Sequence, residues 1–181
     1  KQRADASPPP PPDWRLGAKV KTSAAVYTLC LNVGVTPPDV TPVAAPSLLE
    51  CWIDPNTAGR TAEDAVQAVA DRLQAHVTTH VEKQKQRLKH RQLLDPTTER
   101  VQRHCLAVRK SAKSQRVVFY YNGHGVPAVS ANGEVWVFDK DYTQYIPLSV
   151  FLLQRWLGSP TVYIFDTSRA GLLVDWYLRF A

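Results

Sequence analysis

Methionine is absent from the 181 residues, including position 1, so we expect this chain to be a piece of a longer one. Cysteine is scarce and widely spaced, at Cys30, Cys51 and Cys105. An odd number at that spacing excludes a disulfide framework and a zinc-ligand pattern, and it favours a reducing compartment. No apolar run approaches the roughly 18 residues that cross a bilayer. Charged residues 1–5 lead into polyproline, so we expect neither a signal peptide nor membrane insertion.

Hydrophobic residues make up 44% of the chain, which allows a sizeable core and argues against wholesale disorder. At about 100–200 residues per domain, the length suits one domain. Residues 1–13 include five consecutive prolines and are expected to form a disordered tail. An alternative role for this proline rod is to bind an SH3-like groove. Residues 14–181 are expected to form the domain.

Positive charge is concentrated in one segment. Residues 82–116 carry a net charge of +8, whereas the rest of the chain sums to −2. We expect the Lys and Arg of this segment to lie mostly on the exposed faces of two helices. The segment is then a solvated face, a surface for an acidic protein partner, or a surface for nucleic acid or anionic lipid. It lacks interleaved aromatic residues, so we expect no nucleic-acid partner.

Short apolar segments between turn residues predict four buried strands. These segments are residues 24–33, 48–53, 116–122 and 161–165. Helices are expected over residues 61–81, from Asp95 as N-cap with Pro96 at the first helical position, over residues 148–157, and from Leu172. The first helix has a capping box, and the third ends at Gly158. Asn132-Gly133 resembles a hairpin turn before an alternating strand at residues 134–138.

This order of elements predicts an α/β fold with a largely parallel sheet covered by helices on both faces. The first crossover, residues 34–47, is a proline-rich loop. An antiparallel first pair of strands therefore stays open.

Two loops with chemically active side chains follow buried strands. They are residues 122–125 (NGHG) and residues 166–171 (DTSRAG). If the two strands are neighbours, His124 and Ser168 could face each other, and Asp166 could orient the histidine. A histidine base beside a hydroxyl, with glycine-exposed amides for an oxyanion, is the plan of nucleophilic hydrolysis. The alternative is that His124 caps a turn and Ser168 caps the next helix.

A third segment of interest, residues 142–147 (YTQYIP), combines polar and aromatic side chains with a fixed proline. Such loops often form binding surfaces. The alternative is that Tyr142 and Tyr145 pack down over the strand ends.

The strand-to-histidine segment VVFYYNGHG resembles a motif of the caspase and metacaspase clan. The segment DTSRAG resembles the second motif of that clan, and the alignment places the nucleophilic cysteine of the clan at Ser168. The histidine is kept and the thiol is lost. Because a hydroxyl pKa lies about five units or more above that of a thiol, Ser168 cannot inherit a Cys–His mechanism by position alone.

Further blocks, in order from about residue 13 to 175, resemble the conserved N-terminal domain of the Raptor family. They are DWR at 13–15, LCLNVGVTPPD at 29–39, LECWIDP at 49–55, LDPT at 94–97, YNGHGVP at 121–127, GEVWVFDKDYTQYIPLS at 133–149, GSP at 158–160 and DTSRAG at 166–171. This chain departs from the family at Thr167, where members commonly carry Cys, and at Arg169, where they carry Asn.

The resemblance implies a caspase-like three-layer α/β/α sandwich, truncated at its C-terminal end and catalytically inert. It implies a scaffold in TOR complex 1 that helps to hold TOR kinase and to present substrates carrying TOR signalling motifs. The HEAT repeats and WD40 propeller of that family are absent from this chain. It further implies a cytoplasmic location, or the lysosomal or vacuolar surface through the complex. We expect no cofactor and no metal.

The alternative function is an active peptidase of caspase-like fold that uses a Ser168–His124 pair. For a scaffold, we expect His124, Ser168 and the neighbouring Asp166 to be remnants of a catalytic site. The binding candidates are Asn122, Gly123, His124, Gly125, Tyr142, Gln144, Tyr145, Arg87, Lys89 and Arg91.

Overall fold

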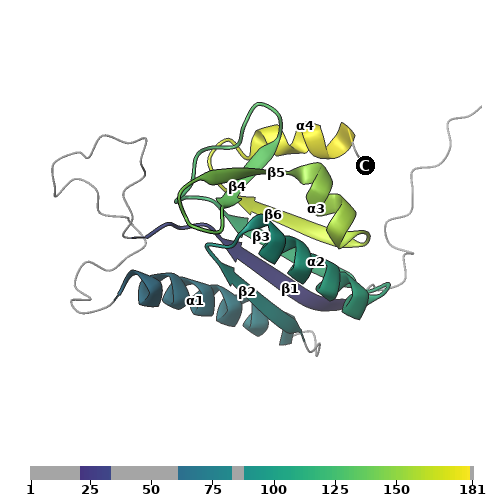
Figure 1. Ribbon diagram of the computed structural model, residues 1–181. Helices are drawn as coiled ribbons and strands as arrows, with labels where there is room; N and C mark the ends of the chain where they lie inside the picture. The colour runs from purple at the N-terminus through teal and green to yellow at the C-terminus, as the bar shows by residue number, and fades with distance from the viewer. Residues whose placement is uncertain (1–20, 34–60, 83–87, 180–181) are drawn as a thin grey trace, which may run out of the picture.

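The computed structural model describes residues 21–33, 61–82 and 88–179. Within these residues, four strands form one parallel sheet in the order β2-β1-β3-β6 (Figure 1). The strands are β1 (Thr22–Leu29), β2 (Lys89–Leu94), β3 (Arg116–Asn122) and β6 (Thr161–Asp166). The predicted α/β fold with a mostly parallel sheet is confirmed.

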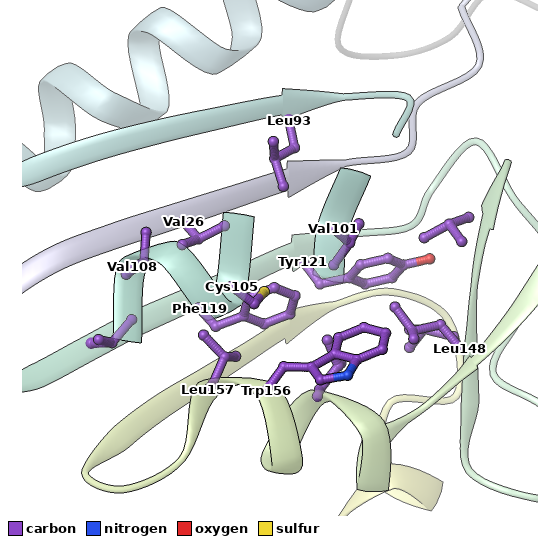
Figure 2. Close-up of a cluster of buried hydrophobic side chains, with 14 of the residues drawn as sticks. Val26, Leu93, Val101, Cys105, Val108, Phe119, Tyr121, Leu148, Trp156 and Leu157 are labelled. Atoms are coloured by element: carbon purple, nitrogen blue, oxygen red, sulfur yellow. The ribbon is translucent and has the colours of Figure 1, made fainter. Parts of the chain in front are cut away.

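Helices cover both faces of the sheet. Helix α1 (Ala62–Glu82) packs on one face, and α2 (Thr98–Ala112), α3 (Val150–Leu157) and α4 (Gly171–Arg179) lie on the other. Figure 2 shows Val101, Cys105 and Val108 of α2 directed toward Phe119 and Tyr121 of β3. This larger core holds the carboxyl ends of β3 and β6 in place, because aromatic side chains from both strands contribute to it.

Helix α1 begins as its sequence predicts. Thr61 Oγ1 accepts a hydrogen bond from the Asp64 amide at 3.2 Å, and the Asp64 carboxylate accepts one from the Thr61 amide at 3.1 Å. This reciprocal pairing satisfies backbone donors that the first helical turn leaves free. Val66 and Ala70 are buried against Leu29 and the rest of the smaller core.

Strand β2 is the first correction. Residues 89–94 of the basic segment form an edge strand of the described sheet, whereas the sequence predicted an exposed helical face. Lys89 and Arg91 are exposed and Leu93 is buried, so only one residue on that face of the strand is apolar and buried. Basic residues at a sheet edge obscure the alternation of apolar and polar residues by which a strand is predicted from sequence. The predicted strand at 48–53 lies outside the described residues, as do the tail 1–13 and Cys51.

Asp95 is the second correction, because it does not cap α2. The N-cap is Thr97, whose hydroxyl accepts from the Arg100 amide at 3.3 Å. Asp95 has a φ of 38°, and its Oδ1 accepts from the amides of Leu31 at 2.9 Å and Asn32 at 3.2 Å. Its carboxylate therefore closes the turn after β1, a contact that local spacing cannot reveal.

The hairpin is the third correction. Strand β4 (Glu134–Phe138) pairs antiparallel with β5 (Tyr145–Ser149), which follows it in the chain. A turn ending at Gly133, with φ of 69°, does precede β4, but it does not join β4 to an earlier strand. Because β5 extends to Ser149, helix α3 begins at Val150 with Ser149 as its N-cap and ends at Gly158 as predicted.

The α1 face of the sheet is only partly covered by the described helices. Helix α1 contacts β1 and β2, while Val162 and Ile164 of β6 are 42% and 43% exposed on that face. The other face of β6 is covered by α3 and α4. The edge formed by β6 is therefore the more open part of the described sheet.

Candidate functional site

The two chemically active loops meet at one edge of the sheet. Strands β3 and β6 are adjacent and parallel, and their register places Asn122 opposite Asp166. The Gly123 amide donates to the Asp166 carbonyl at 3.0 Å. This arrangement confirms the prediction that both loops leave the carboxyl ends of neighbouring strands, where open α/β sheets form sites.

His124 pairs with Asp166. Its ring Nε2 lies 2.8 Å from Asp166 Oδ1, and the two side chains are 38% and 47% exposed. The second carboxylate oxygen, Oδ2, accepts from the Tyr120 hydroxyl at 2.7 Å. Burial raises the pKa of Asp166, but the hydrogen bonds from Tyr120 and His124 outweigh it and leave the pKa below its ordinary value. Asp166 is thus an ionised acceptor at neutral pH, and His124 Nε2 is the donor.

Tyr120 is a residue of this site that the sequence reasoning missed. It lies two positions before Asn122 on the same strand, and side chains two apart in a strand share a face. Burial, and then its hydrogen bond to the Asp166 carboxylate, raise the pKa of Tyr120, so it remains a neutral donor. The alternation of side chains along β3, which places Tyr120 on the same face as Asn122, was the sequence signal that could have identified it.

Ser168 is exposed in the loop after β6 and takes no part in the His124–Asp166 pair. Its carbonyl accepts from the Val129 amide at 3.2 Å. Among the described residues, its hydroxyl makes no hydrogen bond to His124 or to the first turn of α4. The structure therefore assembles neither a serine–histidine dyad nor the alternative helix cap.

The described thiols are buried, and neither hydrogen-bonds to the His124–Asp166 pair. Cys30 and Cys105 are both buried, and burial raises the pKa of Cys105 to about 12 and that of Cys30 well above its ordinary value. A buried thiol with a raised pKa is a poor nucleophile. Thr167, in the loop after β6, donates its hydroxyl to the Gly123 carbonyl at 3.4 Å.

The glycines beside His124 have a steric role. A Cβ on Gly125 would lie 1.8 Å from the Leu31 carbonyl oxygen, and one on Gly123 would lie 2.5 Å from the Tyr121 ring. The Gly125 amide also donates to the Cys30 carbonyl at 3.0 Å. The Gly-His-Gly sequence therefore lets the loop press against the end of β1, which positions His124.

The other loop candidates behave differently from one another. Tyr145 packs down, with its ring 5.7 Å from that of Phe138 and its hydroxyl accepting from Asn32 Nδ2 at 3.1 Å. Tyr142 is 58% exposed, although its ring also contacts Phe138. The Gln144 side chain is exposed, and the Gln144 backbone amide donates to Asp139 Oδ1. Tyr142 and Gln144 thus remain available to a partner.

Of the basic candidates, Lys89 and Arg91 are exposed on β2, and Arg87 lies outside the described residues. The described residues contain no group of three or more His, Cys, Asp or Glu side chains that could hold a metal ion. None of the described helices is both long and apolar enough to cross a membrane.

Comparisons with known proteins agree with this fold. The profile of a family described as the Raptor N-terminal CASPase-like domain matches residues 20–177. The protein raptor homolog of Dictyostelium discoideum is 45% identical over 168 residues, which cover 93% of this chain and 11% of that protein. Target of rapamycin complex 1 subunit mip1 of Schizosaccharomyces pombe is 44% identical over 169 residues, which cover 93% of this chain and 12% of that protein.

A solved structure extends the agreement to three dimensions. The crystal structure of Chaetomium thermophilum Raptor matches with a TM-score of 0.74 and 40% identity, over 93% of this chain and 14% of that one. This chain thus corresponds to a small part of each relative. Because the family profile and the relatives cover most of the chain, the chain belongs to the Raptor family and carries its N-terminal caspase-like domain.

Proposed function

We propose that this domain is a non-catalytic scaffold of TOR complex 1, which helps to bind TOR kinase and to recruit substrates carrying TOR signalling motifs. The observation that carries the proposal is family membership, because relatives over 93% of the chain include a named subunit of target of rapamycin complex 1. The site chemistry agrees with a scaffold. His124 is engaged by Asp166, and a serine stands where the clan has its nucleophile.

The domain is proposed to span residues 14–181 and to work beside HEAT repeats and a WD40 propeller in the cytoplasm, or at the lysosomal or vacuolar surface through the complex. Exposed side chains of the 122–125 and 142–145 loops are the proposed contacts for substrates. The basic residues Arg87, Lys89 and Arg91 are the proposed contacts for TOR, because rim charges steer association and are screened by salt.

Co-purification of TOR with the protein at its natural length tests this function. Reversing Arg87, Lys89 and Arg91 to Glu should lower TOR recovery, and the loss should change with salt concentration. His124→Ala and Ser168→Ala should leave recovery unchanged and serve as matched controls. Failure of the unmodified protein to recover TOR would contradict the scaffold function. Unchanged recovery by the charge-reversed protein would contradict only the assigned surface.

A peptidase is the second candidate, because the His124–Asp166 pair retains the geometry that orients a catalytic base. A fluorophosphonate probe distinguishes the two candidates, since it labels activated serines covalently. Labelling that is lost in Ser168→Ala would support the peptidase. We expect no labelling, because within the described residues the Ser168 hydroxyl is not hydrogen-bonded to His124.

A further inference from the structure

The fold joins two parts of the basic segment that are separated in the sequence. Side chains alternate along β2, and Leu93 packs into the core beneath α2, so Lys89 and Arg91 lie on the α2 side of the sheet. Lys89 Nζ donates to Ser111 Oγ of α2 at 3.1 Å, which confirms this placement. Strand β2 and helix α2 therefore present their basic side chains on one surface.

Helix α2 adds Arg100 and Arg103 to this surface. His104, on the same helix, is half-buried. Partial burial and the positive charges of Arg103, Arg100 and Arg91 all lower its pKa, so the three guanidinium groups are close enough to act on one ring. Arg100 and Arg103 are exposed. Arg100 lies four residues before His104, a spacing that places two side chains on one helix face, and Arg103 directly precedes His104 in the chain. Four cationic side chains thus gather at the β2 edge of the sheet.

These cations have no anionic partner in the described residues. The ion pair found in those residues joins His124 to Asp166 at the end of β6, and β6 and β2 are the two outer strands of the described sheet. Glu99 lies one turn before Arg103 but makes no ion pair with it. Arg109, on the same helix, provides the contrast, because its guanidinium is occupied by backbone carbonyls. Within the described residues, Arg91, Arg100 and Arg103 make no such side-chain contacts and remain available.

We propose that Lys89, Arg91, Arg100 and Arg103 form a docking surface, the β2–α2 basic face, for a carboxylate-rich segment of a protein partner. Arg presents paired donors that match a carboxylate, and charge complementarity favours an acidic segment. Leu106, 47% exposed one turn beyond Arg103, offers an apolar contact that suits a protein chain. These side chains include no aromatic ring on which a nucleic-acid base could stack. The inference rests on the proposed protein-binding function and names the chemistry of its partner.

Fluorescence anisotropy with a labelled oligoglutamate peptide tests the β2–α2 basic face in the protein at its natural length. Arg100→Glu with Arg103→Glu should weaken binding at least about tenfold, and added salt should weaken binding of the unmodified protein. The matched control reverses two exposed arginines elsewhere, Arg72 on α1 and Arg155 on α3, and should change binding by less than about twofold. An oligolysine peptide should not bind detectably.

Two outcomes would overturn the inference. One is equal loss in the basic-face and control variants, which would mean that net charge alone attracts the peptide. The other is tighter binding of a single-stranded oligonucleotide of equal charge, lost in the same basic-face variant, which would make the surface a nucleic-acid site. Arg100→Gln with Arg103→Gln, checked by thermal unfolding, separates loss of binding from loss of fold. Retained TOR co-purification with no oligoglutamate binding would refute this inference and leave the scaffold function standing.

Discussion

His124 directs its ring Nε2 to Asp166 Oδ1 at 2.8 Å, and the Ser168 hydroxyl, on the loop after the same aspartate, makes no hydrogen bond to either side chain within the described residues. In a serine hydrolase the base must reach the hydroxyl that it deprotonates. Here the Asp166 carboxylate engages the histidine, while Ser168 is exposed and not hydrogen-bonded to it. This edge of the sheet therefore holds a histidine oriented by a carboxylate, but within the described residues the Ser168 hydroxyl is not hydrogen-bonded to that histidine.

We expect no peptidase turnover above background with caspase-, metacaspase- or legumain-type peptides. The physical reason is that Ser168 has a hydroxyl pKa far above that of a thiol and no base in contact. Fluorogenic peptide assays of the protein at its natural length would measure this. Robust cleavage that disappears in Ser168→Ala would contradict the prediction, and Ser114→Ala, at an exposed serine elsewhere, is the control for nonspecific loss.

Gly125→Ala should destabilise the sheet edge by at least about 3 kcal/mol, because its Cβ would lie 1.8 Å from the Leu31 carbonyl oxygen and the backbone must move. Gly171→Ala is the matched control, since a Cβ there meets nothing within 4 Å and Gly171 begins a helix. The control should be neutral or stabilising by up to about 1 kcal/mol. Hydrogen exchange of β1 and β3 amides reports both changes. Similar exchange in the two variants would refute the steric role.

Asp95→Ala should cost about 1–3 kcal/mol, because the amides of Leu31 and Asn32 lose their acceptor. Asp95→Asn should be neutral or stabilising at pH 7, because a side-chain oxygen remains and the partly buried charge is removed. Burial raises the folded-state pKa of Asp95 above its ordinary 3.8.

The raised pKa also sets the sign of the pH dependence. The folded protein binds the Asp95 proton more tightly than the unfolded chain does, so this group stabilises the fold below pH 3.8 and loses that contribution as pH rises through its folded pKa. Any advantage of Asp95→Asn should therefore shrink on acidification. Unfolding measured at several pH values would check this, and an advantage that grows at low pH would contradict it.

Arg109→Met should destabilise the domain by about 2–3 kcal/mol, because a single guanidinium joins the ends of α2 and α3 to the start of β6. Its acceptors are the carbonyls of Leu157, Lys113, Gln115 and Pro160 and the hydroxyl of Thr161. Arg103→Met, on the exposed face of the same helix, should change stability by no more than about 0.5 kcal/mol. Thermal unfolding of the two variants compares them directly, and equal losses would rule out the bridging role.

Local sequence determined the elements that carry their own signals. Strand β3 spans the predicted residues 116–122, and β6 begins at the predicted Thr161. The capping box of α1 and the end of α3 at Gly158 could also be predicted from the sequence. Helix caps and the spacing of apolar residues depend only on residues a few positions apart. The glycine-flanked histidine after a buried strand correctly placed His124 at the carboxyl ends of β3 and β6.

Tertiary structure decided the features that depend on distant residues. Strand β2 forms because β1 offers it hydrogen bonds, although its own sequence is basic and polar. Asp95 accepts hydrogen bonds from amides 63 and 64 residues away. His124, after β3, is hydrogen-bonded to Asp166 at the end of the neighbouring strand β6 and not to Ser168. The β2–α2 basic face likewise exists only once the strand lies beside the helix. Spacing along a chain does not encode such contacts, because the crossover connections that bring them together are set by the packing of the whole sheet.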